Sequence, residues 1–435
     1  MPPFRAARTN RPATPNQPGQ SGRSGAASQA GQPDGRGKNA VQLRRFNERL
    51  ALQCLRRLGE ASKAELARSA GLTNAAMGAI VSSLEAQGLV GSEGKRRDGQ
   101  RGQPATVLRL RGDGAYGVGV RLDRTCIETV LIDFDGILLS SVTHEILLPP
   151  PQNALEMVRK DVLKVLELLS PERRERLAGV GLAMPFNLGC WLRELDLPQE
   201  QFRAWDGVDF AGDLEKALGI AVYTENDGTA AAIAELFYGV GRRMDDFLYL
   251  FVGPALGGGL ALSGECLRGP SGNAADVALM PAPPGKLPSA IAPRGEWDIL
   301  LTRASVSALK RHLRHYGVPA SSRADVEAAL QSGHPAVEEW LDDCAEALTP
   351  SVWAARALLD APAVVVGTDF GGGLAGRLRD KLAARLAACA PEGRTPAEIV
   401  VGSFGSDAGA VGAASLPIFY CFSPRKAMLT NGSDG

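Results

Sequence analysis

Residues 41–87 constrain the fold of this chain most, because they place three helix signals in close succession. Hydrophobic residues at helical spacing predict a first helix that starts at Val41. Ser62 and Glu65 form a capping-box pattern at the start of a second helix. Thr73 follows a glycine turn and can cap a third helix. Three short helices in this order predict a helix-turn-helix.

Two strand signals follow the third helix. Leu89 and Val90 begin a short strand, residues 94–104 form a polar loop, and residues 106–110 return as a second strand. A hairpin directly after a helix-turn-helix predicts a winged helix-turn-helix. Such a domain places its third helix in the major groove of double-stranded DNA.

The side chains expected at DNA come from the caps, the third helix and the loop. Asn74 can read the edge of an adenine, and Thr73 can bind a phosphate. The outward face of the third helix has few charges, so the arginines of the loop are expected to supply much of the affinity. The full set is Ser62, Thr73, Asn74, Ala76, Ala79, Ser82, Arg96, Arg97, Arg101, Gly102 and Gln103. The alternative is a domain that binds proteins.

The distribution of charge agrees with a nucleic-acid partner. Residues 1–40 hold six basic residues and one acidic residue, and residues 41–111 hold thirteen basic and six acidic residues. The whole chain has a net charge of zero, so residues 112–435 carry −12. A basic N-terminal quarter on an acidic body is typical of a nucleic-acid-binding module joined to another domain. Solvated surface charge is the alternative interpretation.

Composition divides the chain into three segments. Residues 1–40 are rich in proline, glycine, serine and arginine and are expected to form a disordered basic tail. Residues 41–111 form the expected DNA-binding domain. Residues 112–435 alternate apolar strands with longer helices, which predicts a layered α/β body.

Several classes of protein are excluded by the same composition. No window of about 18 apolar residues is present, so no transmembrane helix is expected. The polar N-terminus is unlike a secretory signal. Seven scattered cysteines without a Cys-x-x-Cys pair argue against a disulfide framework and favour the cytoplasm.

Four motifs, in order, resemble the transcriptional-regulator branch of the ROK family (repressors and sugar kinases). They lie at residues 62–73, 101–104, 225–232 and 253–280, and the resemblance extends from about residue 46 to residue 415. The family's wing usually reads Gly-Arg-Pro, whereas this chain has Gly-Gln-Pro at residues 102–104. The resemblance implies an actin-like ATPase fold of two α/β lobes with a cleft between them.

The resemblance also shows where this chain departs from the kinases. Kinase members use an Asp in the place of Asp227 as base on the sugar hydroxyl, and Asp227 is present. Their first phosphate loop, Asp-x-Gly-Gly-Thr, aligns with residues 121–125, where Arg121 replaces the metal-holding Asp. In their second loop, Pro254 replaces Thr and removes a hydroxyl and an N–H donor. We therefore expect no kinase activity, and we expect the glycine runs 257–259 and 371–373 to be retained turns.

The family's zinc ligands are also absent from the sequence. Leu279 stands in the place of the histidine, and residues 289–296 lack the three cysteines. His312 and His315 share a helix face and are expected to face solvent. No metal and no other cofactor is expected.

Part of the sugar-binding pattern remains. Asn226 and Asp227 match the family directly, Asp276 replaces a Glu, and Asp298 aligns loosely with a second Glu. Carboxylates and amides suit a sugar because each can bind adjacent hydroxyls. These four residues are the expected effector site. The alternative for Asn226 and Asp227 is capping of the helix that follows.

The favoured function is a DNA-binding transcriptional regulator, a repressor that a sugar or related polar effector controls. Two alternatives stay open: a sugar kinase with a DNA-binding appendage, and a regulator that a protein partner controls. A homodimer or tetramer is expected, because a two-fold protein on a pseudo-palindromic site doubles the contacts of one winged domain.

Overall fold

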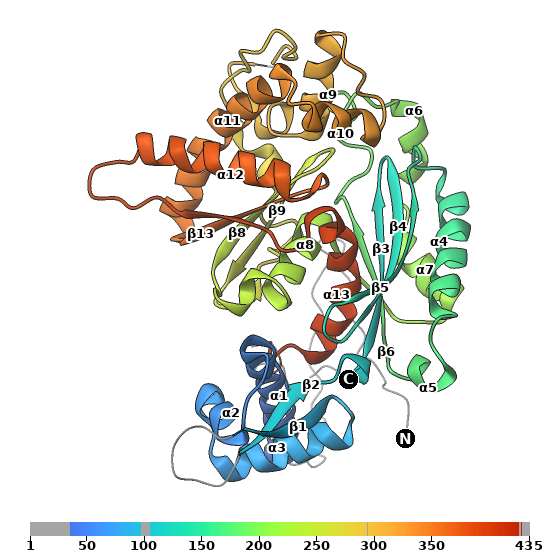
Figure 1. Ribbon diagram of the computed structural model, residues 1–435. Coiled ribbons are helices and arrows are strands. Elements are labelled where there is room, and N and C mark those ends of the chain that lie inside the picture. Colours follow the sequence, from blue (N-terminus) through green and yellow to red (C-terminus); the bar gives the residue numbers. More distant parts are fainter. Residues whose placement is uncertain (1–34, 97–104, 294, 426–427, 429–435) are drawn as a thin grey trace, which may run out of the picture. The chain divides into compact units, whose positions relative to one another are not determined.

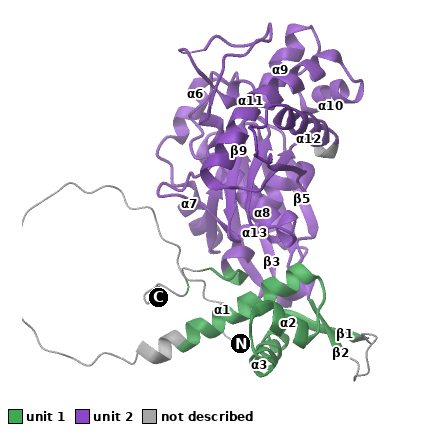
Figure 2. Cartoon of the chain, turned by 90° about the vertical axis from the view of Figure 1, so that its left-hand side faces the viewer, with its two compact units in different colours: residues 1–110, 421–435 green, residues 111–420 purple. Residues whose placement is uncertain are grey.

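The computed structural model describes residues 35–96, 105–293, 295–425 and 428, and the chain forms two compact units (Figure 2). Unit 1 comprises residues 1–110 and 421–435, and unit 2 comprises residues 111–420. The chain therefore passes from one unit to the other twice. The second passage lies within helix α13 (Ala408–Phe422), whose last two residues belong to unit 1.

Unit 1 contains the three expected helices and the hairpin. Its elements are α1 (Gly35–Leu58), α2 (Lys63–Ala70), α3 (Asn74–Ala86), β1 (Val90–Arg96) and β2 (Ala105–Leu110). Helix α1 begins at Gly35, inside the segment expected to form a tail, while residues 1–34 lie outside the described chain. The antiparallel hairpin pairs Val90 with Leu110, and a bridge between Ala61 and Leu108 joins it to the residues before α2.

The core of unit 1 explains why the three helices pack as they do. Leu52 and Leu55 of α1, Leu66 of α2 and Met77 of α3 are all at most 2% exposed. Gly71 ends α2 with φ +65°, a backbone conformation that a glycine adopts at little cost. The sharp turn brings α3 across α2, and the apolar stripe of α3 then faces the core.

Unit 2 is a two-lobed α/β body with an actin-like fold (Figure 1). The first sheet has the order β5-β4-β3-β6-β7, and the second has the order β10-β9-β8-β13-β14. In each sheet the first three strands are antiparallel and the last two run parallel to the central strand. The two lobes are thus built on one repeated topology.

The strands of unit 2 are β3 (Tyr116–Asp123), β4 (Cys126–Asp133), β5 (Leu138–His144), β6 (Leu177–Met184), β7 (Val222–Asn226), β8 (Phe247–Val252), β9 (Leu256–Leu262), β10 (Glu265–Cys266), β11 (Pro281–Ala282), β12 (Asp298–Ile299), β13 (Ala363–Thr368) and β14 (Glu398–Val401). The helices before α13 are α4 (Pro151–Leu166), α5 (Pro171–Arg174), α6 (Gln199–Phe202), α7 (Phe210–Leu218), α8 (Asp227–Phe237), α9 (Val306–His315), α10 (Arg323–Gln331), α11 (Pro335–Leu359) and α12 (Gly371–Ala388). Short 3₁₀ turns are η1 (Gly112–Gly114), η2 (Arg203–Trp205), η3 (Val240–Arg242), η4 (Val277–Leu279), η5 (Leu300–Thr302) and η6 (Gly405–Asp407).

Two helices, α8 and α13, lie between the sheets and hold them together (Figure 1). Glycines allow this close approach. A Cβ on Gly119 of β3 would lie 2.2 Å from the backbone nitrogen of Ala414 in α13, and one on Gly412 would lie 2.7 Å from the carbonyl carbon of Ala230 in α8. A Cβ on Gly228 of α8 would lie 2.3 Å from the carbonyl oxygen of Gly258 in β9. These contacts fix the distance between the lobes.

The same packing corrects the interpretation of the glycine runs as turns. Residues 257–259 lie within strand β9, where Gly259 lets α8 approach the sheet and Gly258 makes room for Ala275 and Val277. Residues 371–373 form the first turn of α12. Within the part of the chain that the structure describes, every helix is too short or too polar to cross a bilayer. All seven cysteines are free thiols.

Candidate functional site

The outward face of α3 is a continuous exposed surface. The five residues that the sequence placed there, Thr73, Asn74, Ala76, Ala79 and Ser82, are all exposed. The opposite face of the helix is buried against the core through Met77, Ile80, Val81 and Leu84. Because most of the exposed side chains are small, the backbone of α3 can approach the floor of a DNA groove closely.

Ser62 differs from the other members of the DNA-contact set because it is buried. Its hydroxyl caps α2 by accepting a hydrogen bond from the Glu65 backbone N–H at 3.3 Å. The Glu65 carboxylate accepts from the backbone N–H and the hydroxyl of Ser62, at 2.7 and 2.8 Å. Ser62 is only 9% exposed. These bonds give Ser62 a structural role at the start of α2.

The wing lies mostly outside the described residues. Arg96 is the last residue of β1, and Arg97, Arg101, Gly102 and Gln103 fall in the stretch 97–104 that the structure leaves out. The hairpin that carries the wing is described. Its Arg109 forms ion pairs with Glu60 and Glu93, the latter at 3.0 Å.

Three of the four expected effector residues come together at the start of α8. Asn226 caps the helix by accepting from the Gly228 backbone N–H at 2.9 Å, and its amide donates to Asn273 at 3.4 Å. Asn273 in turn donates to Asp276 at 2.9 Å. The capping interpretation of Asn226 is therefore confirmed, and its amide is free to take part in a polar chain as well. Asn273 was missed, although it lies within the motif at residues 253–280.

Asp227 is the fourth polar group of this cluster. Its carboxylate accepts from the Gly228 N–H at 2.8 Å. Burial raises the pKa of Asp227, and the nearby charge of Asp123 raises it further while Arg121 opposes the change. Burial also raises the pKa of Asp276, against the hydrogen bond from Asn273. Such carboxyl groups suit hydroxyl ligands, because each can accept or donate a hydrogen bond.

Asp298 lies apart from this cluster. Its carboxylate accepts from the backbone N–H of Ile299 at 2.9 Å. Among the described residues, no hydrogen bond or ion pair joins it to Asn226, Asp227 or Asp276, and its charge acts instead on Arg311. The loose alignment at this position explains the difference.

A buried ion pair of unit 2 occupies the place of the first kinase phosphate loop. Arg121 of β3 bonds Asp369, at the end of β13, with Nη1 3.0 Å from Oδ1. Its Nη2 lies 3.6 Å from Asp123 Oδ2, and the guanidinium lies 5.4 Å from the ring centroid of Phe251. Burial opposes the charge of Arg121, but Asp369 and Asp123 together raise its pKa, so it stays protonated.

A cavity of about 640 Å³ opens beside this ion pair. It is lined from the first lobe by the β3–β4 turn and the end of β5, and from the second lobe by Pro254, α9, α10 and the residues after β13. None of the four expected effector residues lines it. The cleft between the lobes therefore has two chemically different parts, the polar cluster around Asn226 and this cavity.

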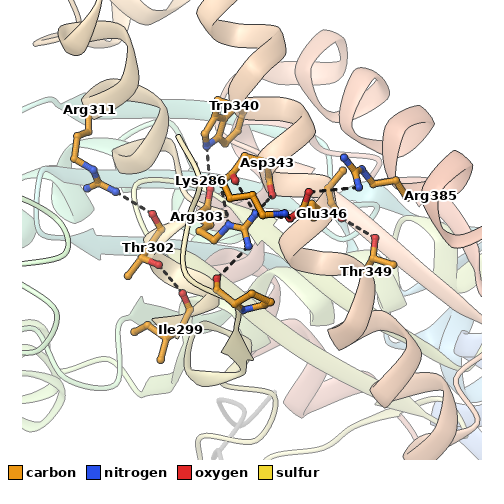
Figure 3. A network of polar contacts seen from close by, with 12 residues as sticks. Lys286, Ile299, Thr302, Arg303, Arg311, Trp340, Asp343, Glu346, Thr349 and Arg385 are labelled. Carbon is orange, nitrogen blue, oxygen red and sulfur yellow. Dashed lines mark hydrogen bonds and ion pairs between the residues drawn. The ribbon is translucent and has the colours of Figure 1, made fainter. Parts of the chain in front are cut away.

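The residues that the sequence aligned with the family's zinc site lie in η4 and in the loop that follows β11. Leu279 of η4 is 47% exposed. The loop that follows β11 is fastened by Arg303, which bonds Asp343 of α11 at 2.6 and 3.0 Å and the carbonyl of Pro283 at 3.1 Å (Figure 3). Trp340 donates to the carbonyl of Arg303 at 3.0 Å. In the described residues, no group of three His, Cys, Asp or Glu side chains could hold a metal ion.

The expectation that His312 faces solvent is wrong. His312 is fully buried on α9, 2.8 Å from the Ser289 hydroxyl and 3.0 Å from a carboxylate oxygen of Glu339 on α11. Burial comes from α11, which packs on α9 although the two helices are separated in sequence. Through its contact with Ser289, His312 therefore holds the loop that follows β11 at a second position. His315 shows the expected exposure.

The model of the ROK family matches residues 117–418 of this chain. The uncharacterized protein y4fQ of Sinorhizobium fredii is 29% identical over 87% of this chain and 92% of its own length. The xylose repressor of Bacillus subtilis is 21% identical over 62% of this chain and 69% of its own length. A glucokinase of Thermotoga maritima is 27% identical over 69% of this chain and 96% of its own length.

A solved structure agrees with the fold of the chain. It is described as a ROK family transcriptional regulator and homolog of the E. coli MLC protein, and it aligns with a TM-score of 0.62 at 19% identity. The alignment covers 90% of this chain and 100% of the other. At this identity, the likeness concerns the fold.

Proposed function

The chain belongs to the ROK family, and on this premise we propose that it is a DNA-binding transcriptional repressor controlled by a small polar effector of the sugar class. Regulators of this family include the xylose repressor among the relatives of the chain. The observation that carries the proposal is the exposed face of α3, which is capped at Thr73, faces away from the core and is preceded by a glycine turn.

The proposed DNA contacts are those of α3 and the wing. Asn74 lies in the first turn of α3, where side chains of a recognition helix reach base edges. Wing arginines Arg96, Arg97 and Arg101 would bind phosphates and supply the salt-dependent part of the affinity. We leave Ser62 out of the proposed contacts because its hydroxyl is engaged in the capping box.

The test is DNA binding by the full-length protein to sequences selected from a random duplex pool. Affinity should fall by roughly three to five orders of magnitude between 50 and 200 mM salt if about six to ten phosphates are contacted. Replacing Arg96, Arg97 and Arg101 together by Gln should weaken binding and flatten the salt dependence. Arg173→Gln, an exposed change in unit 2, is the matched control. Unchanged affinity in the triple variant would reject the wing as the DNA contact.

We place the effector at the polar chain of Asn226, Asn273 and Asp276, with Asp227 beside it. Its amides and carboxyl groups alternate donors and acceptors, which suits a ligand with adjacent hydroxyls. A ligand here controls DNA binding only if it binds two states of the body with different affinity. Fluorescence titration with a panel of pentoses and hexoses, in the presence and absence of DNA, measures that difference. If no sugar binds and a protein partner releases the DNA, control belongs to the partner.

The competing function is a sugar kinase, and the retained Asp227 is the observation in its favour. Against it stands Arg121, whose guanidinium neutralises Asp123 and Asp369 in the region where kinase members hold magnesium. A coupled assay with Mg·ATP and a broad sugar panel decides the matter. Saturable turnover that Asp227→Asn abolishes would establish the kinase.

A further inference from the structure

The cavity between the lobes is lined by a half-buried positive charge that the effector cluster does not explain. Lys310 and Arg314 are one helical turn apart on α9, and both line the cavity. Two like charges at this spacing repel each other. Burial lowers the pKa of Lys310, and the charge of Arg314 lowers it further.

Lys310 lacks a counter-ion among the described residues. Its ammonium donates to the carbonyl of Ser321 at 3.4 Å, and no carboxylate lies within 4 Å of it. By contrast, Arg314 pairs with Asp196 at 2.9 Å, and Arg323 pairs with Glu327 at 2.9 Å. A half-buried ammonium without a counter-ion is costly unless a ligand supplies the negative charge.

The carboxylates that line the cavity do not compensate the charge of Lys310. Asp123 and Asp369 form ion pairs with Arg121, and Asp196 forms an ion pair with Arg314. Glu145, the fourth carboxylate of the lining, is exposed to solvent, so its attraction for Lys310 is screened.

The rest of the lining indicates an organic ligand. Ile146 and Leu147 remain 38% and 37% exposed at the cavity, and Leu195, Leu197 and Phe370 extend the apolar wall. Hydroxyl groups of Ser321 and Ser322 lie near the basic end. A volume of about 640 Å³ is in the ordinary range for small-molecule sites. The cavity thus offers a cationic end and an apolar wall to one ligand.

We propose that this cavity binds a small phosphate monoester without a divalent metal, with its dianion at Lys310 and Arg314 and its carbon skeleton on the apolar wall. Lys310 supplies a charge without a counter-ion, and Arg314, which also pairs with Asp196, supplies further N–H donors to a phosphate. Metal is not required, because the fixed guanidinium of Arg121 already compensates the carboxylates that could bind it. The site is separate from the polar cluster around Asn226, so it can exist whether or not a sugar binds there.

The experiment uses the full-length protein in EDTA with phenyl phosphate as probe, a phosphate monoester with an apolar group. Calorimetric titration and thermal melting should show saturable binding to the native chain. Lys310→Met should weaken binding at least tenfold, and Arg314→Gln should weaken it to a smaller extent. Lys216→Met, an exposed lysine paired with Asp213 at 3.3 Å, is the matched control and should bind as the native chain does.

Three further measurements make the outcome decisive. Benzoate has the same ring with a single negative charge, and tighter binding of benzoate than of phenyl phosphate would overturn the assignment to phosphate. Binding of Mg·ATP that is lost in EDTA, with none of phenyl phosphate, would overturn the metal-free site. Equal affinity in Lys310→Met, with melting and circular dichroism unchanged, would remove Lys310 from the site. None of these results bears on the DNA-binding proposal, which has a separate test.

Discussion

Arg121 Nη1 lies 3.0 Å from Asp369 Oδ1, and this pair joins the central strand of one sheet to the end of a strand of the other. Arg121 and Asp369 are 5% and 6% exposed. The pair therefore links the two lobes of unit 2 through a buried contact.

The pair gives the first prediction. Arg121→Met should lower the free energy of unfolding by about 3–5 kcal/mol, because it leaves the carboxylate of Asp369 buried without a counter-ion. Urea unfolding of the full chain measures the change. The double variant Arg121→Met with Asp369→Leu should recover much of the loss, since it removes a buried charge as well. A double variant as unstable as the single one would contradict the pairing.

The second prediction concerns pH and Glu128, which faces Arg121 across β3 and β4. Burial raises the pKa of Glu128 from 4.5 to about 7, with Arg121 opposing and Asp407 and Asp369 adding to the rise. The folded state therefore binds this proton more tightly than the unfolded chain. Its stabilising effect is complete below about pH 4.5 and is lost as the pH rises through about 7.

Glu128→Gln should remove this contribution. Between pH 5 and pH 8, the free energy of unfolding should decline less for the variant than for the native chain, by a difference on the order of 2 kcal/mol. Urea unfolding at each pH measures this difference. Asp227, Glu225 and Glu235 also have raised pKa values and titrate in both proteins, so the difference isolates Glu128. Parallel pH curves would show that Glu128 is ionised in the fold.

The third prediction concerns the network of Arg303 in Figure 3. The Arg303 side chain is 2% exposed and bonds both oxygens of the Asp343 carboxylate. Arg303→Met should cost about 3–5 kcal/mol, because a charged Asp343 would stay buried alone. Lys286→Met, which removes the exposed lysine that pairs with Glu346 at 2.9 Å, should cost less than about 1 kcal/mol. Equal losses of unfolding free energy in the two variants would mean that Lys286 contributes as much to the network as Arg303 does.

The fourth prediction tests the effector cluster without disturbing the cap of α8. Asn226→Ala would remove the acceptor that caps Gly228 N–H, at a cost of about 1 kcal/mol. Asn273→Ala together with Asp276→Ala spares that bond. This double variant should bind DNA as the native chain does and should lose the response to whichever sugar of the panel releases DNA. A full response in the double variant would place the effector elsewhere.

The fifth prediction is the oligomeric state. A homodimer or a dimer of dimers is expected from the few base-reading side chains of one α3, because two-fold symmetry doubles the contacts with a pseudo-palindromic site. Light scattering at micromolar concentration, with and without selected DNA, measures the mass. A monomer that binds a half-site tightly would contradict the expectation.

The strands and long helices of the body could be predicted closely from the sequence. The apolar run at residues 247–252 predicts a strand, and β8 lies at Phe247–Val252, because both faces of a central strand are buried. The pattern at residues 335–360 predicts a helix, and α11 lies at Pro335–Leu359. Helix α10, which is only nine residues long, was missed.

The polar contacts were harder to predict, because they depend on residues distant in sequence. Arg121 was recognised as a departure from the kinase loop, but its partner Asp369 is 248 positions away. His312 looked like a surface residue because its helix carries many basic groups, and only the packing of α11 buries it. Asn273 lacked a signal beyond its position after a glycine turn, and its contact with Asn226 joins residues 47 positions apart.

The double passage of the chain between the units has a topological consequence. Unit 1 is connected to unit 2 after Leu110 and again through α13, whose helix continues across the boundary at Tyr420 and Cys421. A single cut of the backbone in either connection would therefore leave the two units covalently joined by the other.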